Sequence, residues 1–394
     1  MPPPKRGNKR PPKPAPKPIT ADESGAPSFN ANAFLHSWGP HSLPQHNGFR
    51  AAIEKAFDID PTSDYVYRAD PAAVTLPQVQ VAIDHGSARG FHAFYLDENG
   101  LQPDPPNPSP TDIEAYISVF SPTTSTTKAL TALGSNAKKG SLRASIAANL
   151  LNKIVLPSST SSTRISLPAK GKAPIITNPY FDIWAWSCQC LEWGGPNVDT
   201  DKVKISHHIL PVLYNHFGCL CPSGDALSIM QQLAAPPGTS MRRPVVEIGS
   251  GNGYWAFLLR KLGLTVYAVD NHHSLWRTTW IQDTIIKDGV KFLQSPPTSL
   301  PVSPGERGCC DSILLMVYPQ VGNDFTGKII RAYEGDIVIV AGTQNGNGYT
   351  GFKDEIIDAW FVRERPAFEK VMQIPLPSFA AKDEALFVFA RKKE

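Results

Sequence analysis

The most regular arrangement of apolar and polar segments begins in the second half of the chain. Val245, Val246 and Ile248 form a short apolar run of the kind that fills the middle of a parallel sheet. Glycines follow at alternate positions, and an amphipathic helix is predicted from about Tyr254 to Leu262, before a second apolar strand over residues 264–269. This order of elements predicts an α/β sheet with a tight turn after the first of these strands.

Upstream of this unit, apolar positions indicate short helices separated by breaks rich in proline, serine or threonine. We expect an accessory, mainly helical region over residues 28–172, with helices at about 48–57, 76–88, 111–120 and 141–154. A second helical segment is expected over residues 173–240, where Ser206 can cap a helix that starts near His207. This segment contains an aromatic cluster made of Tyr180, Phe181, Trp184, Trp186 and Trp193.

Composition separates the first residues from the rest of the chain. Residues 1–20 contain six Lys or Arg, eight prolines and no acid, so we expect residues 1–27 to form an extended, disordered arm. Without residues 1–20, the 38 basic residues of the whole chain fall to 32 against 35 acidic residues, and the net charge of +3 becomes −3. A folded body of this charge argues against nucleic-acid binding, which requires concentrated positive charge.

The sequence also bears on where the protein works. No apolar run reaches the length of a transmembrane helix, and the N-terminus has no apolar signal-peptide core, so we expect no membrane association. A cytoplasmic location is expected, and Lys5-Arg6 with Lys9-Arg10 leave a nuclear location open. The alternative interpretation of these basic pairs is a solvated tail.

The glycine-rich turn carries the chemistry. Gly249, Gly251 and Gly253 lack side chains, so a ligand can approach the backbone, and the N–H groups at the start of the next helix can accept an anion. Asp270 ends the second strand, where open α/β sheets bind ligands, and a carboxylate there can hold both hydroxyls of a ribose. A dinucleotide fingerprint would need a third glycine at position 254, which is Tyr254.

The sequence E-x-G-x-G-x-G beginning at Glu247 resembles the first motif of class I S-adenosylmethionine-dependent methyltransferases. The resemblance implies that Glu247 orients the turn and the methionine end of S-adenosylmethionine, and that Asp270 holds the ribose. The turn residues and the neighbour of Asp270 would line the cofactor, namely Gly249, Ser250, Gly251, Gly253 and Asn271.

The rest of the chain supplies the other strands that this family requires, so the resemblance covers about residues 241–394. It implies an α/β fold with a seven-stranded, mostly parallel sheet that ends in an antiparallel hairpin, and a helical lid over residues 173–240. Asp288 and Gly289 match the position where the family places an acid near the adenine. The other strands are expected at 285–286, 311–317, 337–342, 368–374 and 385–390, with a helix at 324–333.

Methyl transfer is a direct displacement, so the protein mainly has to align the acceptor and exclude water. If the acceptor must lose a proton, the nearby bases are His272, His273 and Tyr318. The two histidines can equally be surface residues at the cofactor's edge. Tyr318 follows the strand over 311–317, where substrate-facing residues lie in this family, and aromatic packing is the alternative.

Two further motifs suggest other chemistry. Cys188-x-Cys190 and Cys219-x-Cys221 could supply thiolates to zinc, but the spacing is shorter than that of zinc knuckles, and we predict no metal site. Asn178-Pro179-Tyr180 resembles the N/D-P-P-Y motif of nucleic-acid and some protein methyltransferases. It stands before Glu247 and has one proline, so turn chemistry is the preferred interpretation.

The prediction is therefore a methyltransferase that uses S-adenosylmethionine and acts on a small molecule or a protein side chain. One alternative is a cofactor-binding scaffold without transfer activity. A weaker alternative is RNA or DNA methylation through the basic arm. The sequence does not predict an oligomeric state.

Overall fold

A computed structural model describes residues 29–392 of the chain apart from short internal segments, and the predicted arm over residues 1–27 lies outside the described residues. The internal segments that are not described are 40–41, 45–47, 70–71, 97–98, 100, 102–107, 159–162, 204–205, 237, 239, 273–275, 297–308, 322–323, 345–350 and 353–354.

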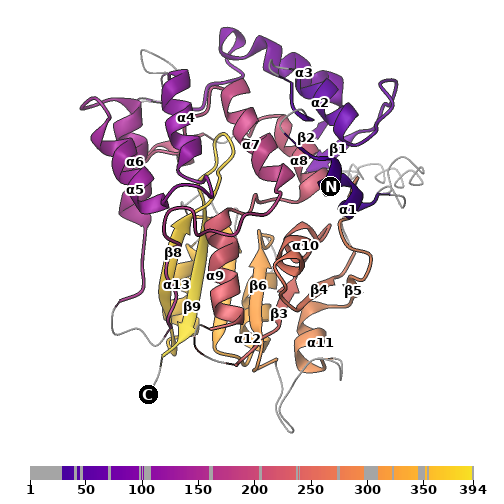
Figure 1. Ribbon diagram of the computed structural model, residues 1–394, viewed down its shortest axis with the longest axis vertical. Helices are drawn as coiled ribbons and strands as arrows, with labels where there is room; N and C mark the ends of the chain where they lie inside the picture. Colours follow the sequence, from indigo (N-terminus) through magenta and orange to yellow (C-terminus); the bar gives the residue numbers. More distant parts are fainter. Residues whose placement is uncertain are drawn as a thin grey trace, which may run out of the picture.

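A seven-stranded sheet with the order β5-β4-β3-β6-β7-β9-β8 forms one half of the molecule (Figure 1). The first five strands in this order are parallel, and β9 pairs antiparallel with both β7 and β8. The predicted mostly parallel α/β sheet with a terminal antiparallel hairpin is confirmed. The strands are β3 (Val245–Ile248), β4 (Val266–Asp270), β5 (Ile285–Ile286), β6 (Ile313–Val317), β7 (Ile337–Thr343), β8 (Phe368–Pro375) and β9 (Glu384–Arg391).

Both faces of the sheet are buried against helices. Successive side chains of a strand point to opposite faces, so each strand contributes to both sides. Val245 of β3 belongs to one apolar cluster with α9 and α10, while Val246 and Ile248 belong to a second cluster with α11, α12 and α13. The helices are α9 (Gly224–Ala234), α10 (Tyr254–Lys261), α11 (Gly289–Gln294), α12 (Phe325–Ala332) and α13 (Ile357–Glu364).

The predicted lid segment, residues 173–240, contains α7 (Pro179–Cys190), α8 (Ile209–Phe217) and α9. Buried indoles tie it to the sheet domain: the Nε1 groups of Trp184 and Trp193 both donate to the carbonyl of Ser378, at 3.0 and 2.8 Å. The expected cap at Ser206 is wrong. The helix begins at Ile209, whose N–H donates to the imidazole Nδ1 of His207 at 3.2 Å.

The accessory region lies with α7 and α8 at one end of the sheet (Figure 1). Its predicted helices are confirmed by α2, α3, α4 and α6, while α1, α5 and the β1–β2 hairpin were not predicted. Side chains of this region share one apolar cluster with the lid segment and the sheet. The elements are α1 (Ala31–Ser37), α2 (Phe49–Ala56), β1 (Tyr67–Ala69), β2 (Ala72–Val74), α3 (Leu76–His85), α4 (Pro110–Ser118), α5 (Thr126–Ser135) and α6 (Leu142–Lys153).

None of the helices in the described ranges is both long and apolar enough to cross a membrane.

Candidate cofactor site

The glycine turn between β3 and α10 has a backbone that glycine alone adopts without strain. Gly249, Gly251 and Gly253 have φ angles of 77°, 56° and 81°. The N–H groups of Gly249 and Ser250 both donate to the carbonyl of Val269, at 2.8 and 3.1 Å. These bonds tie the turn to the end of β4, so the two elements that the sequence assigns to one site are held together.

Close packing is a second reason for glycine in the turn. A Cβ atom on Gly251 would lie 2.9 Å from Cζ2 of Trp276, and one on Gly253 would lie 2.3 Å from Cγ1 of Ile281. Gly249 has more room, because its Cβ would meet the nearest atom, Cζ of Phe325, at 3.8 Å. The turn is therefore covered on one side by residues that follow β4.

Asp270 lies against the turn, as the ribose-binding hypothesis requires. Its Oδ2 accepts a hydrogen bond from the N–H of Gly251 at 2.9 Å, and its Oδ1 accepts one from the N–H of His272 at 2.7 Å. The side chain is half-buried, and the neighbouring Asn271 is exposed. Two backbone donors thus fix the carboxylate while solvent still reaches it.

Glu247 is buried beneath the turn, with 1% of its surface exposed. Burial raises the pKa of its carboxyl to about 8, and the nearby Arg260 and a hydrogen bond from the Ala256 amide limit that rise. Ala256 belongs to the first turn of α10, where helical N–H groups need partners from outside the helix. Glu247 therefore anchors the helix start from the strand.

Unpartnered polar atoms near the turn fit a bound polar ligand. Oε2 of Glu247 and Oγ of Ser250 are buried and have no hydrogen-bond partner in the described part of the chain. Buried polar atoms normally have partners. An ammonium group, such as that of the methionine portion of S-adenosylmethionine, would supply both a charge partner and hydrogen-bond donors here.

Asp288 and Gly289 follow β5 and begin α11. The exposed Asp288 caps this helix by accepting a hydrogen bond from the N–H of Lys291 at 2.9 Å. Gly289 is buried, and a Cβ there would lie 2.5 Å from Ile248 and 2.6 Å from Ile329. Both residues have structural roles at this position, and their contact with an adenine stays a prediction.

The candidate bases lie at the carboxyl ends of β4 and β6, the two strands that flank β3 in the sheet. His272 follows β4, is exposed and has a φ of 59°, while Tyr318 follows β6, is half-buried and has a φ of 50°. A left-handed backbone is unfavourable for both residue types, and such conformations concentrate at functional sites. His273 lies outside the described residues.

A buried polar cluster beside Tyr318 was not predicted. The ring of Tyr214 from α8 lies 6.1 Å from the ring of Tyr318, and the Tyr214 hydroxyl and Oε1 of Glu384 are buried without a hydrogen-bond partner among the described residues. Burial raises the pKa of Glu384 to about 8, and Lys382 opposes that rise. Tyr214 lies 170 positions before Glu384 in the chain, so local patterns could not reveal the cluster.

The structure also locates the Asn178-Pro179-Tyr180 motif and the cysteine pairs. Asn178 caps α7 by accepting a hydrogen bond from the N–H of Phe181 at 3.2 Å, and it accepts another from the Tyr254 hydroxyl at 2.7 Å. The preferred interpretation as turn chemistry agrees with this geometry. Cys188 and Cys221 are buried thiols, and the described residues contain no group of His, Cys, Asp or Glu that could hold a metal ion.

The strand order, together with the glycine turn after β3, agrees with the class I methyltransferase-like fold that the sequence resemblance implies. No family model matches the chain, and no curated protein matches it.

Three solved structures are distantly similar to this chain. A S-adenosylmethionine-dependent methyltransferase from Anabaena variabilis is 12% identical, with 38% of this chain and 77% of that chain covered and a TM-score of 0.26. A ribosomal protein L11 methylase from Lactobacillus delbrueckii is 12% identical, with 42% and 79% covered and a TM-score of 0.22. A Rossmann-superfamily protein from Streptococcus agalactiae is 12% identical, with 42% and 68% covered and a TM-score of 0.26.

Proposed function

We propose that the protein is a methyltransferase that uses S-adenosylmethionine and acts on a small molecule or a protein side chain. One observation carries the proposal: the Asp270 carboxylate is hydrogen-bonded to the Gly251 amide of the glycine turn. This contact brings together the hydroxyl-binding acid and the side-chain-free backbone that a sulfonium nucleoside needs. The buried, unpartnered Oε2 of Glu247 supports it from below the turn.

Each residue of the site has a defined task in this proposal. Asp270 would hold the ribose hydroxyls, and the turn would receive the methionine portion on its backbone. Glu247 would balance the ammonium charge by releasing, on cofactor binding, the proton that it keeps in the unliganded protein. When bound, S-adenosylmethionine supplies an activated methyl group for direct displacement.

On the acceptor side, the chain offers Tyr318 and the polar cluster next to it. Glu384, with a pKa of about 8, is mostly protonated at neutral pH and becomes available as a proton acceptor as the pH rises toward 8, and the Tyr214 hydroxyl can donate or accept a hydrogen bond. The lid segment, which contributes Tyr214, would exclude water from the acceptor. We infer that these groups position the acceptor atom and remove its proton.

The choice of acceptor class rests on charge. The chain beyond residue 20 has 32 basic and 35 acidic residues, which does not favour a phosphate backbone as the substrate. A small molecule or a protein side chain needs no such positive surface.

The test is transfer of tritium from methyl-labelled S-adenosylmethionine into a cell lysate, followed by separation into protein, nucleic-acid and small-molecule fractions. We expect label in the protein or small-molecule fraction with the wild type and none with Gly251→Arg, which fills the turn. Asp270→Ala serves as a milder second variant if Gly251→Arg does not fold. Cofactor binding without transfer to any fraction would instead identify a scaffold, and label in the nucleic-acid fraction would contradict the proposed acceptor class.

A further inference from the structure

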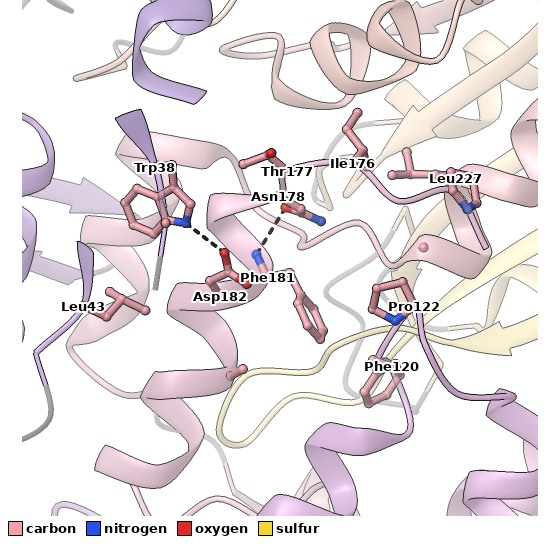
Figure 2. Close-up of a pocket in the computed structure, with 14 residues that line it drawn as sticks. Trp38, Leu43, Phe120, Pro122, Ile176, Thr177, Asn178, Phe181, Asp182 and Leu227 are labelled. Atoms are coloured by element: carbon pink, nitrogen blue, oxygen red, sulfur yellow. Dashed lines mark hydrogen bonds between the residues drawn. The ribbon is translucent and has the colours of Figure 1, made fainter. Parts of the chain in front are cut away.

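A pocket of about 500 Å³ opens beside helix α7, and none of its lining residues belongs to the predicted cofactor-binding set. The walls come from segments that are distant in the sequence: the end of α1 and the residues after it, the segment after α4, the segment before α7 with the first half of that helix, and the start of α9. Figure 2 shows Trp38, Phe181 and Asp182 around one side of this space and Phe120 and Pro122 on another. Small-molecule sites have volumes of about 300–1,000 Å³, so the pocket has the size of a ligand site.

The pocket walls are mostly aromatic and aliphatic. Trp38, Phe120 and Phe181 provide rings, and Leu227 and Ile176 provide aliphatic surface. Among the described residues that line the pocket, Asp182 is the one charged side chain, and none is Lys, Arg or His. Such a lining disfavours phosphates and carboxylates and favours a cation with an apolar body.

Asp182 is held in place at the pocket mouth. Its Oδ2 accepts a hydrogen bond from Nε1 of Trp38 at 2.8 Å, which Figure 2 marks with a dashed line. The side chain remains open to solvent, yet the surrounding protein raises the pKa of the carboxyl, and the Trp38 hydrogen bond opposes that rise. No basic side chain in the described part of the chain contributes to the Asp182 shift. The carboxylate therefore has capacity for a cationic partner.

We propose that this pocket binds a small organic cation, namely a protonated amine carried on an aromatic or aliphatic body. The ammonium group would donate hydrogen bonds to Asp182, and the body would lie against the rings of Trp38 and Phe181. Charge-assisted hydrogen bonds and contacts of cations with aromatic faces both strengthen such binding. This site does not depend on the proposed methyl transfer.

One contact connects the pocket wall to the cofactor half of the molecule. Asn178 lines the pocket, and its Oδ1 accepts the hydrogen bond from the hydroxyl of Tyr254, the first residue of α10. Tyr254 itself is 1% exposed and does not line the pocket. Because no residue of the glycine turn lines the pocket, amine binding should persist when a substitution in that turn abolishes cofactor binding.

The experiment is ligand-observed NMR and calorimetry with matched probes that share a ring and differ in the head group. Tryptamine and phenethylamine carry an ammonium group, their alcohol counterparts carry a hydroxyl, and their acid counterparts carry a carboxylate. The protein is the full chain as the wild type, as Asp182→Asn, and as Gly251→Arg. Asparagine keeps an oxygen that can accept the Trp38 hydrogen bond and removes only the charge.

We expect both amines to bind the wild type, the alcohols to bind at least about tenfold more weakly, and the acids not to bind, in line with the strength of hydrogen bonds to charged groups. Asp182→Asn should weaken amine binding by about tenfold or more with an unchanged melting curve, and folded Gly251→Arg should bind amines like the wild type. Absence of amine binding, equal binding of amines and alcohols, or equal binding by Asp182→Asn would overturn the proposal. If the wild type bound the amines but not S-adenosylmethionine, the proposed methyl transfer would fail and the amine site would stand.

Discussion

The Oδ2 atom of Asp270 accepts a hydrogen bond from the backbone N–H of Gly251 at 2.9 Å, so the acid at the end of β4 and the turn after β3 form one unit. This contact orients the carboxylate before any ligand is present. A site that is organised in advance loses less free energy on binding than one that must be assembled.

Gly251→Ala should destabilise the protein and abolish S-adenosylmethionine binding. The new Cβ would lie 2.9 Å from Trp276, and a φ of 56° is unfavourable for alanine by about 1–2 kcal/mol. Chemical denaturation and calorimetry measure both effects. Gly263→Ala is the matched control, because Gly263 has a φ of 82° but nothing within 4 Å of its Cβ position. Gly263→Ala should lose stability and keep ligand binding; intact ligand binding by Gly251→Ala would contradict the site.

Glu247→Gln should reduce the loss of stability that the wild type shows as the pH rises. The folded-state pKa of Glu247 is raised from 4.5 to about 8, so between these values the folded state keeps a proton that the unfolded state releases. Stability therefore falls with rising pH across this window, by an amount on the order of a few kcal/mol. Glutamine has no proton to lose, so unfolding free energies measured across the window should show a smaller slope.

The buried Glu384 contributes in the same direction, so Glu247→Gln should lower the slope without removing it. The same substitution at the exposed Glu369 controls for the change in net charge. A slope equal to that of the wild type would show that Glu247 is ionised in the folded protein.

Asn178→Ala should cost about 2 kcal/mol of stability and leave S-adenosylmethionine binding intact. The substitution removes the cap of α7 and also leaves the buried Tyr254 hydroxyl without its acceptor. Ser141→Ala is the control, because Ser141 caps α6 through the N–H of Ala144 and should cost about 1 kcal/mol. Denaturation of both variants measures the difference. If Asn178→Ala kept full stability and lost methyl transfer, the N/D-P-P-Y interpretation would return.

Tyr214→Phe should raise stability by about 1 kcal/mol and slow methyl transfer. The substitution removes a buried hydroxyl that has no hydrogen-bond partner in the described part of the chain, so the desolvation cost of this group disappears. Residues retained at the expense of stability are characteristic of functional sites. The measurements are denaturation and the tritium assay on the fraction that the wild type labels. A less stable variant with normal transfer would assign Tyr214 to packing.

The sheet and the glycine turn could be predicted because their signals are local. Glu247 and Asp270 are 23 positions apart, and the turn, the helix and the strand between them each have their own pattern. The same holds for the β8–β9 hairpin. Asp288 shows the limit of local patterns. An acid that follows a strand can be a cofactor ligand or a helix cap, and the local sequence is the same in both cases.

Contacts across the fold could not be predicted. Trp184 donates to the carbonyl of Ser378 across 194 positions, and Trp38 donates to Asp182 across 144. An aromatic cluster predicts burial in the core but not the partner that satisfies each indole N–H. The polar cluster of Tyr214 and Glu384 and the amine pocket both depend on such pairings. Chain topology, and not local pattern, places these residues together.

Calorimetric titration of the wild type and of Asp270→Ala with S-adenosylmethionine and with NADH tests the central claim most directly. We predict that the wild type binds S-adenosylmethionine and not NADH, and that Asp270→Ala weakens this binding by about tenfold or more, because two charge-assisted ribose contacts are lost. Preferential binding of NADH, or equal affinity of the two proteins for S-adenosylmethionine, would contradict the assignment of the Asp270–Gly251 unit as a cofactor site.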